Sequence, residues 1–304
     1  MKKIIITIVA VLTLIGCSSE EQVIETAPTE TTETNTEEPI EDDEKPIEND
    51  EEPDLNNPVY LAENGITVKA RDWAVIGDSG EIDGEIYTIV DRFTIREAVN
   101  RQGEVNARLK FMVTTKITDM SALFLTTPYY GNPNNSSYES NVITGWDVSN
   151  VTNMWKMFKF SSFNQPIDIW DVSNVTDMYE MFYAAEYFNH PLNSWDVSNT
   201  TWADRGLLRM FYAAYEFNQD LSSWDVSHIT NMREMFYGAT SFNQDLSSWD
   251  VSNVTNMAYM FYYATSYNQD LSSWDVNNVA YCDRFSQSAN SWVLAKPNFT
   301  NCNP

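Results

Sequence analysis

Carboxylates are the side chains that this sequence offers most regularly for chemistry. Six aspartates each follow a tryptophan in a repeated Trp-Asp-Val motif: Asp147, Asp171, Asp196, Asp225, Asp250 and Asp275. They lie between two apolar residues of an alternating segment, so they should project to solvent, and stacked parallel strands would place them ~4.8 Å apart in a row. Oxygen ligands of this kind suit calcium. The alternative, favoured by the single carboxylate per repeat, is an aspartate ladder held by nearby hydroxyls and backbone amides.

Tyrosines form a second repeated column, in which each follows a phenylalanine: Tyr183, Tyr212, Tyr237 and Tyr262. Such rings offer a large rigid area with a polar tip, which suits a glycan or a protein ligand. Alternatively, each ring covers the seam between adjacent repeats. Trp202 lies in an insertion at 199–206, and insertions in repeat proteins often map to a binding face. We include it in the candidate ligand face, with simple drift between copies as the alternative.

The usual catalytic constellations are missing from the sequence. The two histidines, His190 and His228, replace a Gln and an Asn of the repeat, so no nucleophile–histidine–acid set stands apart from it. No phosphate-binding glycine loop or paired-cysteine metal motif is present. We therefore expect no enzyme, and no cofactor beyond the candidate calcium. The net charge of −26 argues against a nucleic-acid partner, because phosphate contacts dominate that affinity.

The elements that must position these columns form a repeat. Its tryptophans are 24, 25, 29, 25 and 25 residues apart: Trp146, Trp170, Trp195, Trp224, Trp249 and Trp274. This period is typical of units that bury their apolar faces only by stacking. Alternation over 246–251 predicts a short strand. Apolar residues at i, i+3, i+4 and i+7 from Met257 to Ala264 predict a short helix, with Asn256 as its N-cap (Asp177 and Asn231 likewise).

These patterns predict an α/β solenoid of short parallel strands and short helices, with an α+β N-terminal cap. From Leu246 the pattern L-x-x-W-x-V-x-x-V-x-x-M-x-x-M-F-x-x-A resembles a leucine-rich repeat. WDVSNVTNM at 146–154 and 249–257, and FNQDLSSWDV at 217–226 and 242–251, are similar to the BspA-like leucine-rich-repeat surface proteins. The resemblance covers roughly residues 59–304. It implies an exported surface protein with a role in adhesion and supplies no active site.

The N-terminal residues read as a lipoprotein leader and a tether. Residues 1–17 have two lysines, a short apolar core and Leu-Ile-Gly-Cys at 14–17, which looks like a bacterial lipobox that would be acylated at Cys17. The alternative is an ordinary signal peptide with an incidental cysteine. Residues 18–57 form an acidic disordered tether, since 16 of the 44 acidic residues lie between Glu20 and Asp54. Ser18 to Glu21 resembles acidic sorting signals for the outer surface.

The remaining chain divides by pattern into a cap (58–124), a loop (125–145), the repeats (146–285) and a C-terminal cap (286–304). In the first cap we expect strands at 65–69 and 85–90, a turn at Asp83-Gly84, a helix at 94–102 and a degenerate repeat helix at 116–124. Cys282 occupies a methionine position of the last repeat and can pair with Cys302 outside the reducing cytosol. The alternative is two free thiols.

The sequence therefore predicts a membrane-anchored lipoprotein of the bacterial cell envelope, exposed on the surface, and in the outer membrane if the source has two membranes. Its lipid anchor would contact the membrane, and its repeats would bind an extracellular protein or glycan in adhesion. The alternative is a structural envelope component or spacer without a dedicated ligand.

Overall fold

The computed structural model describes residues 54–100, 108–125, 143–201 and 205–304. These residues belong to one compact unit that spans 53–304. The predicted leader with Cys17, nearly all of the tether, most of the 125–145 loop and Trp202 lie outside the described residues. Among the helices that are described, none has the length and apolar character needed to cross a membrane.

The chain begins with a small α+β cap. β1 pairs with β2 in an antiparallel ribbon in which Val59 is opposite Ala70. A second sheet has the order β3-β4-β5, with β4 and β5 parallel, and α1 follows β4 along the chain. The elements are β1 (Val59–Leu61), β2 (Val68–Ala70), β3 (Ser79–Ile82), β4 (Glu85–Ile89), α1 (Arg92–Asn100) and β5 (Met112–Val113).

Local sequence signals account for most of this cap. Asp83 and Gly84 both have positive φ between β3 and β4, as a two-residue hairpin turn requires. The strand predicted at 85–90 is confirmed as β4. The helix begins two residues earlier than predicted, because Asp91 Oδ1 accepts the N–H of Thr94 at 2.7 Å and acts as the N-cap. The strand predicted at 65–69 is shifted and shorter, at Val68–Ala70.

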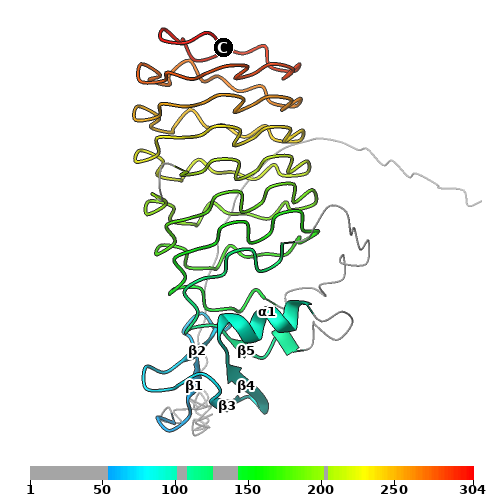
Figure 1. Cartoon of the computed structure of the whole chain (residues 1–304), viewed down its shortest axis with the longest axis vertical. Helices are drawn as coiled ribbons and strands as arrows, with labels where there is room; N and C mark the ends of the chain where they lie inside the picture. Colours follow the sequence, from blue (N-terminus) through cyan, green and yellow to red (C-terminus); the bar gives the residue numbers. More distant parts are fainter. Residues whose placement is uncertain (1–53, 101–107, 126–142, 202–204) are drawn as a thin grey trace, which may run out of the picture. The chain divides into compact units, whose positions relative to one another are not determined.

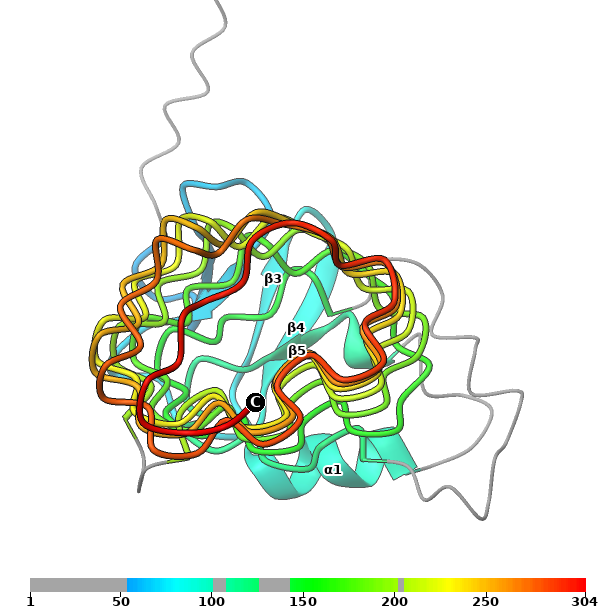
Figure 2. The ribbon, with the colours of Figure 1, turned by 90° about the horizontal axis from the view of Figure 1, so that it is seen from above.

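Beyond the cap, successive coils of the chain stack on one another along one direction (Figure 1). Seen along the stack, their paths nearly superpose (Figure 2). Ile95 of α1 and Leu109 belong to the same buried apolar cluster as the coils, so the cap continues the core of the stack. This arrangement confirms stacked repeated units. A smaller cluster that includes Val59, Ile89 and Val113 forms the core of the cap itself.

Two ladders of buried aromatic rings run through the stack. Neighbouring rings of the first ladder are 5.5 to 5.7 Å apart between centroids, and its members are Phe158, Phe182, Phe211, Phe236 and Phe261. Rings of the second are 5.9 to 6.1 Å apart, and its members are Phe163, Phe188, Phe217, Phe242 and Tyr267. Each ring of this size buries a large apolar area within the stack.

The repeat tryptophans connect each unit to the one before it. The indole N–H of Trp249 donates to the carbonyl of Leu221 at 2.9 Å, and Trp274 donates to Leu246 at 2.9 Å. Equivalent bonds hold Trp146, Trp170, Trp195 and Trp224. A buried indole N–H without a partner would be costly, so each tryptophan ring is stable only with its neighbouring unit in place.

The predicted repeat strands are wrong. From residue 143 on, the described part of the chain contains no helix and no extended strand, only turns and isolated bridges. The predicted alternation is present, since Leu246, Trp249 and Val251 are buried and Asp250 is exposed. However, the N–H of Trp249 bonds the carbonyl of Leu246 at 3.1 Å. This local bond closes a four-residue turn in place of an extended ladder.

The predicted repeat helices are also wrong, and two consecutive β-turns replace each one. Met260 N–H donates to Met257 O at 3.1 Å, and Ala264 N–H donates to Phe261 O at 3.0 Å. The third residue of each turn has positive φ, 59° at Tyr259 and 58° at Tyr263, as in a type II turn. The first and fourth residues of each turn point inward. Two such turns therefore produce the same i, i+3, i+4, i+7 burial as a helix face.

Parallel backbone pairing occurs at these turns. The N–H groups of Met257, Tyr259 and Phe261 donate to the carbonyls of Tyr281, Asp283 and Phe285 in the next unit, at 2.8 to 2.9 Å. Alternate N–H groups thus bond along the stack. Of the others, Ala258 N–H donates to Asn256 Oδ1 at 3.0 Å and the rest close turns. Segment 116–124 joins in the same way, with Met120 N–H on Asn153 O. It is a first unit, as predicted, but built from turns.

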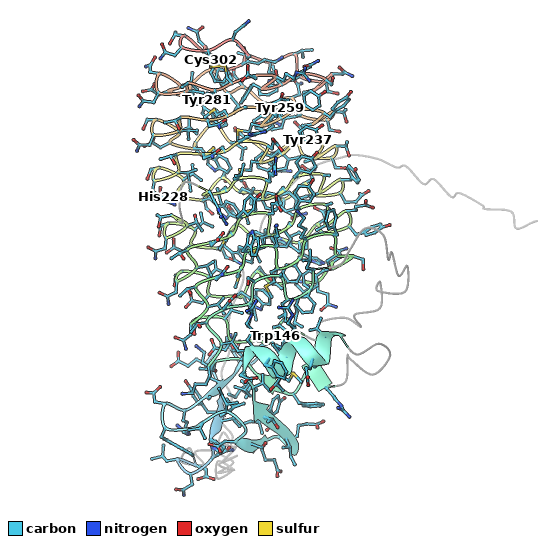
Figure 3. All side chains as sticks on the ribbon, in the orientation of Figure 1. Trp146, His228, Tyr237, Tyr259, Tyr281 and Cys302 are labelled. Carbon is cyan, nitrogen blue, oxygen red and sulfur yellow. A yellow bond between two sulfur atoms is a disulfide. The ribbon has the colours of Figure 1, made fainter. Side chains whose placement is uncertain are left out.

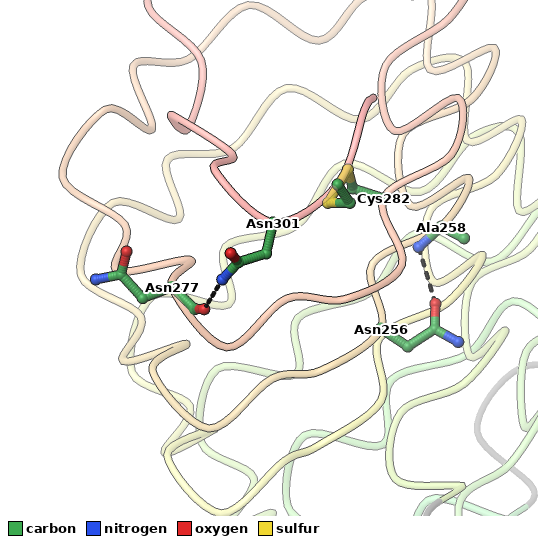
Figure 4. The surroundings of a disulfide bond; sticks show 6 residues. Asn256, Ala258, Asn277, Cys282 and Asn301 are labelled. Atoms are coloured by element: carbon green, nitrogen blue, oxygen red, sulfur yellow. Dashed lines mark hydrogen bonds between the residues drawn. A yellow bond between two sulfur atoms is a disulfide. The ribbon is translucent and has the colours of Figure 1, made fainter.

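The predicted disulfide is present between Cys282 and Cys302, which are 20 residues apart in the chain (Figure 4). Cys282 is buried at the methionine position of the last unit. Nearby, Asn301 Nδ2 donates to the carbonyl of Asn277, and the ring of Phe299 lies 5.0 Å from that of Phe285. The C-terminal residues are therefore held against the last unit by covalent, polar and aromatic contacts.

The positive φ of the turns predicts that alanine is less stable than glycine at position 238. We expect Gly238→Ala to lower the free energy of unfolding by about 1 kcal/mol, because Gly238 has φ +66° and alanine is strained there. The equivalent Ala213, with φ 52°, should tolerate Ala213→Gly or gain stability from it. A helix would give the opposite result, with Gly238→Ala stabilising by about 1 kcal/mol. Urea unfolding of both variants decides between the two.

The disulfide predicts a second stability effect. Cys302→Ala should lower the free energy of unfolding by about 3 kcal/mol, because the unfolded chain then loses a 20-residue covalent loop. Reductant should destabilise the wild-type protein by a similar amount and leave the variant unchanged. Mass spectrometry of exported protein under non-reducing conditions checks the bond itself; free thiols at both cysteines would contradict it.

Candidate binding strip

The outward residues of the paired turns lie above one another in six successive units and form one strip, which we call the turn strip. Its residues, unit by unit, are Trp155, Lys156, Lys159 and Phe160; Tyr179, Glu180, Tyr183 and Ala184; Leu208, Arg209, Tyr212 and Ala213; Arg233, Glu234, Tyr237 and Gly238; Ala258, Tyr259, Tyr262 and Tyr263; and Asp283, Arg284, Gln287 and Ser288. Figure 3 marks Tyr237 and Tyr259 in successive units.

The predicted tyrosine column is a continuous stack of rings. Tyr183 and Tyr212 are 4.3 Å apart between ring centroids, as are Tyr212 and Tyr237, and Tyr237 and Tyr262 are 4.9 Å apart. The ring faces therefore cover the seams between units, which is the alternative that the sequence left open. The rings are only partly buried, so their edges remain accessible from solvent.

Burial also affects the pKa of these tyrosines. Desolvation raises the pKa of Tyr183, Tyr212 and Tyr237 above the ordinary value of 10.0. An ordinary phenol is already neutral at physiological pH, so these are neutral too, and each hydroxyl can both donate and accept a hydrogen bond. Neighbouring hydroxyls of the column also bond one another. The column consequently offers a row of uncharged polar tips.

A ladder of alternating charge runs beside the tyrosines, at the third residue of the first turn. Its members in order are Lys156, Glu180, Arg209, Glu234, Tyr259 and Arg284. Lys156 Nζ lies 3.6 Å from Glu180 Oε2, and Arg209 lies 3.3 Å from Glu180 Oε1. Arg209 Nε also lies 2.7 Å from Glu234 Oε2. Because neighbours have opposite sign, each charge helps to set the order of the units.

The carboxylate of Glu180 is the centre of this ladder. Burial tends to raise its pKa, but hydrogen bonds from Lys159 and Tyr179 and the charges of Lys159 and Lys156 outweigh that tendency. The pKa of Glu180 is consequently held below its ordinary value of 4.5. A buried carboxylate in this state needs its cations, since removing a partner would leave an uncompensated charge.

Aromatic rings surround the cations at the start of the strip. Lys156 Nζ is 4.3 Å from the ring centroid of Trp155, and Lys159 Nζ is 4.0 Å from that of Tyr183. Arg205, just before the third unit, reaches back to 5.3 Å from the ring of Tyr179. Cation–π contacts of this geometry fix the side chains on the surface.

The charge ladder was not predicted from the sequence, because its residues look unrelated when each unit is considered alone. A signal was available, since Lys, Glu, Arg and Glu follow two residues after the first apolar position of four successive units. When the four residues are compared as one column, their charges alternate in sign, which indicates ion pairs between neighbouring units. Tyr259 interrupts the alternation, and the guanidinium of Arg284 instead lies 5.8 Å from the centroid of that ring.

The aspartate column lies at a different set of outward positions. Each Oδ1 accepts the backbone N–H two residues on, at 3.0 to 3.2 Å, for Asp147, Asp171, Asp196, Asp225, Asp250 and Asp275. This is the ladder held by backbone amides that the sequence left as an alternative to calcium. Within the described ranges, no three His, Cys, Asp or Glu side chains gather to hold a metal ion. Calcium binding by the column remains a prediction.

Asp147 departs from the rest of its column. It is buried, whereas the other five aspartates are exposed, and its Oδ1 lies 3.4 Å from Nζ of Lys69 in β2. The hydroxyl of Thr114, next to β5, donates to the Asp147 carbonyl at 2.8 Å. The first aspartate of the column thus joins the cap to the stack.

A separate hollow of about 460 Å³ lies in the cap, lined by Leu55, Tyr60, Ala70, Arg71, Asp72 and Trp73. Its arginine is already engaged, because Arg71 Nε donates to the carbonyl of Asn57 and the guanidinium lies 5.2 Å from the Tyr60 ring centroid. The hollow offers aromatic area but lacks the repetition that distinguishes the turn strip.

The aspartate column predicts acid sensitivity. Hydrogen bonds from the serine two residues on lower the pKa of Asp196, Asp225 and Asp250 below 3.8. Since the folded pKa is depressed, the stabilisation is present above pH 3.8 and is lost as pH falls through the folded value. Asp225→Asn should therefore weaken the pH dependence of unfolding at acid pH. Carboxyl titration by NMR checks the direction; folded values at or above 3.8 would contradict it.

Comparison with protein families gives two matches to one model. Residues 93–208 and 205–296 match the family described as "Mycoplasma protein of unknown function, DUF285". Together the matches extend from α1 into the C-terminal tail and cover more than half of the chain. No curated protein and no solved structure matches the chain. The repeated, stacked chain described above therefore belongs to the DUF285 family.

Proposed function

We propose that the protein is a cell-surface lipoprotein that displays its stacked units for binding to an extracellular protein or glycan. The observation that carries this proposal is the composition of the turn strip. Tyrosine, tryptophan and arginine dominate binding hot spots, and all three lie on this one strip. The rings are already ordered by stacking, so a ligand would meet little entropic cost in fixing them.

The other outward positions of the units support this assignment by contrast. They are mostly Ser, Asn, Asp and Thr, and they bond to neighbouring units. For example, Asn253 Nδ2 donates to Ser227 O at 2.8 Å, and Asn243 N–H donates to Asn218 Oδ1 at 2.9 Å. These groups hold the stack together. The turn strip, in contrast, carries tyrosine rings whose faces stack between units and whose edges remain partly exposed.

The N-terminal sequence supports display on the cell envelope. Acylation of Cys17 would anchor the chain, and the acidic tether would hold the stacked units away from the membrane. The motifs shared with BspA-like leucine-rich-repeat surface proteins support a solenoid with a role in adhesion. In this proposal the anchor lies in the outer membrane where the source has one.

A structural envelope component or spacer is the second candidate. The self-satisfied polar columns favour it, since a surface whose donors and acceptors bond within the stack has few groups left for a ligand. The two candidates differ at the turn strip, which a spacer would not use.

A binding screen separates them. We expect the purified full chain to bind saturably to one member of a panel of glycans, matrix proteins and envelope polymers, tested with calcium and with chelator. Tyr212→Phe combined with Tyr237→Phe keeps the stacked rings and removes two hydroxyls, so it should weaken that binding about tenfold. Calcium-dependent binding that is lost on Asp250→Asn would instead place the ligand site on the aspartate column.

Tyr267→Phe is the matched control, because the Tyr267 hydroxyl is buried without a hydrogen-bond partner. It should leave binding unchanged. If the folded protein binds no member of the panel, the result would support the structural spacer.

A further inference from the structure

We infer that the ligand of the turn strip is a linear anionic polysaccharide that lies along the stack. This inference rests on the proposed function and adds the chemical class of the ligand. The main observation is the uneven distribution of positive charge in this acidic chain.

Charge is segregated around the units. Seven basic residues follow Trp146, and six of them lie on or reach onto the turn strip: Lys156, Lys159, Arg205, Arg209, Arg233 and Arg284. The seventh, Lys296, lies in the C-terminal tail. The aspartates of the Trp-Asp-Val motif occupy other outward positions. In a chain with a net charge of −26, a polyanion would therefore be repelled from the rest of the repeat surface and attracted to this strip.

Three of these cations, Arg205, Arg233 and Arg284, are exposed and available to a ligand. The side chains of Arg205 and Arg233 are each 44% exposed, and their nearest carboxylates, Asp177 and Glu234, are buried beneath them. Glu234 is also held by Arg209 at 2.7 Å and 3.3 Å. Arg233 can therefore turn to an external anion without leaving Glu234 unpaired. Arg209 cannot, because it joins Glu180 to Glu234.

The placement of the cations suits a chain that runs along the stack. They occur in the first, third, fourth and sixth units of the strip, and five steps of about 4.8 Å separate the first from the sixth. The tyrosine column runs in the same direction between them. Beside it the second turn carries only the small residues Ala184, Ala213 and Gly238 in the second to fourth units, whereas Phe160 and Lys159 of the first unit contact the ring of Tyr183.

The tyrosine tips favour a polysaccharide over an acidic peptide. Each phenol both donates and accepts, which matches the repeated hydroxyls of a sugar chain, while the arginines match its carboxylate or sulfate groups. A neutral glycan would leave the arginines without anionic partners. An acidic peptide would match the arginines but would offer the hydroxyl row fewer partners.

Calorimetry with the full chain tests the inference. The probes are heparin, hyaluronan, neutral dextran and polyglutamate, each titrated at several salt concentrations. We expect heparin or hyaluronan to bind saturably, with an affinity that falls as salt rises, and dextran not to bind. Heparin without hyaluronan would assign the anion as sulfate, and equal binding would assign it as carboxylate.

Matched variants locate the site. Arg205→Gln combined with Arg233→Gln should weaken binding about tenfold, whereas Lys110→Gln combined with Lys296→Gln, which removes the same charge elsewhere, should change it less than twofold. Thermal unfolding of both variants verifies that they are folded, and if the arginine pair fails to fold, Arg233→Gln alone replaces it. Equal weakening by the two pairs would overturn the inference, as would tighter binding of dextran or polyglutamate.

The binding screen and the variants distinguish failure of the proposed binding function from failure of the proposed ligand class. A ligand that requires the Tyr212 and Tyr237 hydroxyls but is indifferent to Arg205 and Arg233 would keep the proposed function and overturn the anionic polysaccharide. Failure of every probe and every panel member would overturn both.

Discussion

The structure depends on backbone hydrogen bonds that run along the stack from alternate residues of consecutive β-turns. In each turn pair the N–H groups at alternate positions donate to the next unit, as from Met154, Lys156, Phe158 and Phe160 to the carbonyls of the following unit. Most of the remaining N–H groups close the turns, and the second residue of a pair, such as Ala258, donates to the side chain of the preceding Asn. In the pairs that begin at Met154 and Met257 every backbone donor thus has a partner, as a buried segment requires. This division also forces the third residue of every turn into positive φ.

The positive φ requirement explains the side chains that the turns present outward. A non-glycine residue whose φ lies near +55° has a less favourable backbone free energy than glycine, so contacts of its side chain must offset that difference. Glu180 and Arg209 do so through ion pairs, and Tyr259 does so through contact with its neighbours. The strain and the surface chemistry of the turn strip therefore coincide, because the third residue of each turn both has positive φ and carries an outward side chain.

Much of this fold could be predicted from the sequence, and the errors share one cause. The stacked repeats, the inward residues of each unit, β4, α1 and the Cys282–Cys302 bond all followed from period, alternation and spacing. The secondary structure of the repeats did not, because burial at i, i+3, i+4 and i+7 describes two four-residue turns as well as it describes a helix. Gly238, at the third position of a turn, was the clearest available signal of β-turns. Glu180, Arg209 and Tyr259 at the third position of other turns concealed it.

The candidate site was partly visible in the same way. The tyrosine and aspartate columns are present at the predicted positions, but sequence could not say that the ring faces stack on each other or that Asp250 bonds its own backbone. Those outcomes depend on the distance between units and on turn geometry. The charge ladder was missed because it is a property of four units together, and no single copy of the repeat contains it.

The alternating charge has a consequence for how such a chain can change in length. If the unit that contains Arg209 were deleted, Glu180 would lie against Glu234, and two buried carboxylates would face each other. Duplication of that unit would place two arginines side by side. Gain or loss of units in pairs preserves the alternation, whereas single steps need a compensating substitution. This constraint holds for the four units from Lys156 to Glu234, because Tyr259 ends the alternation.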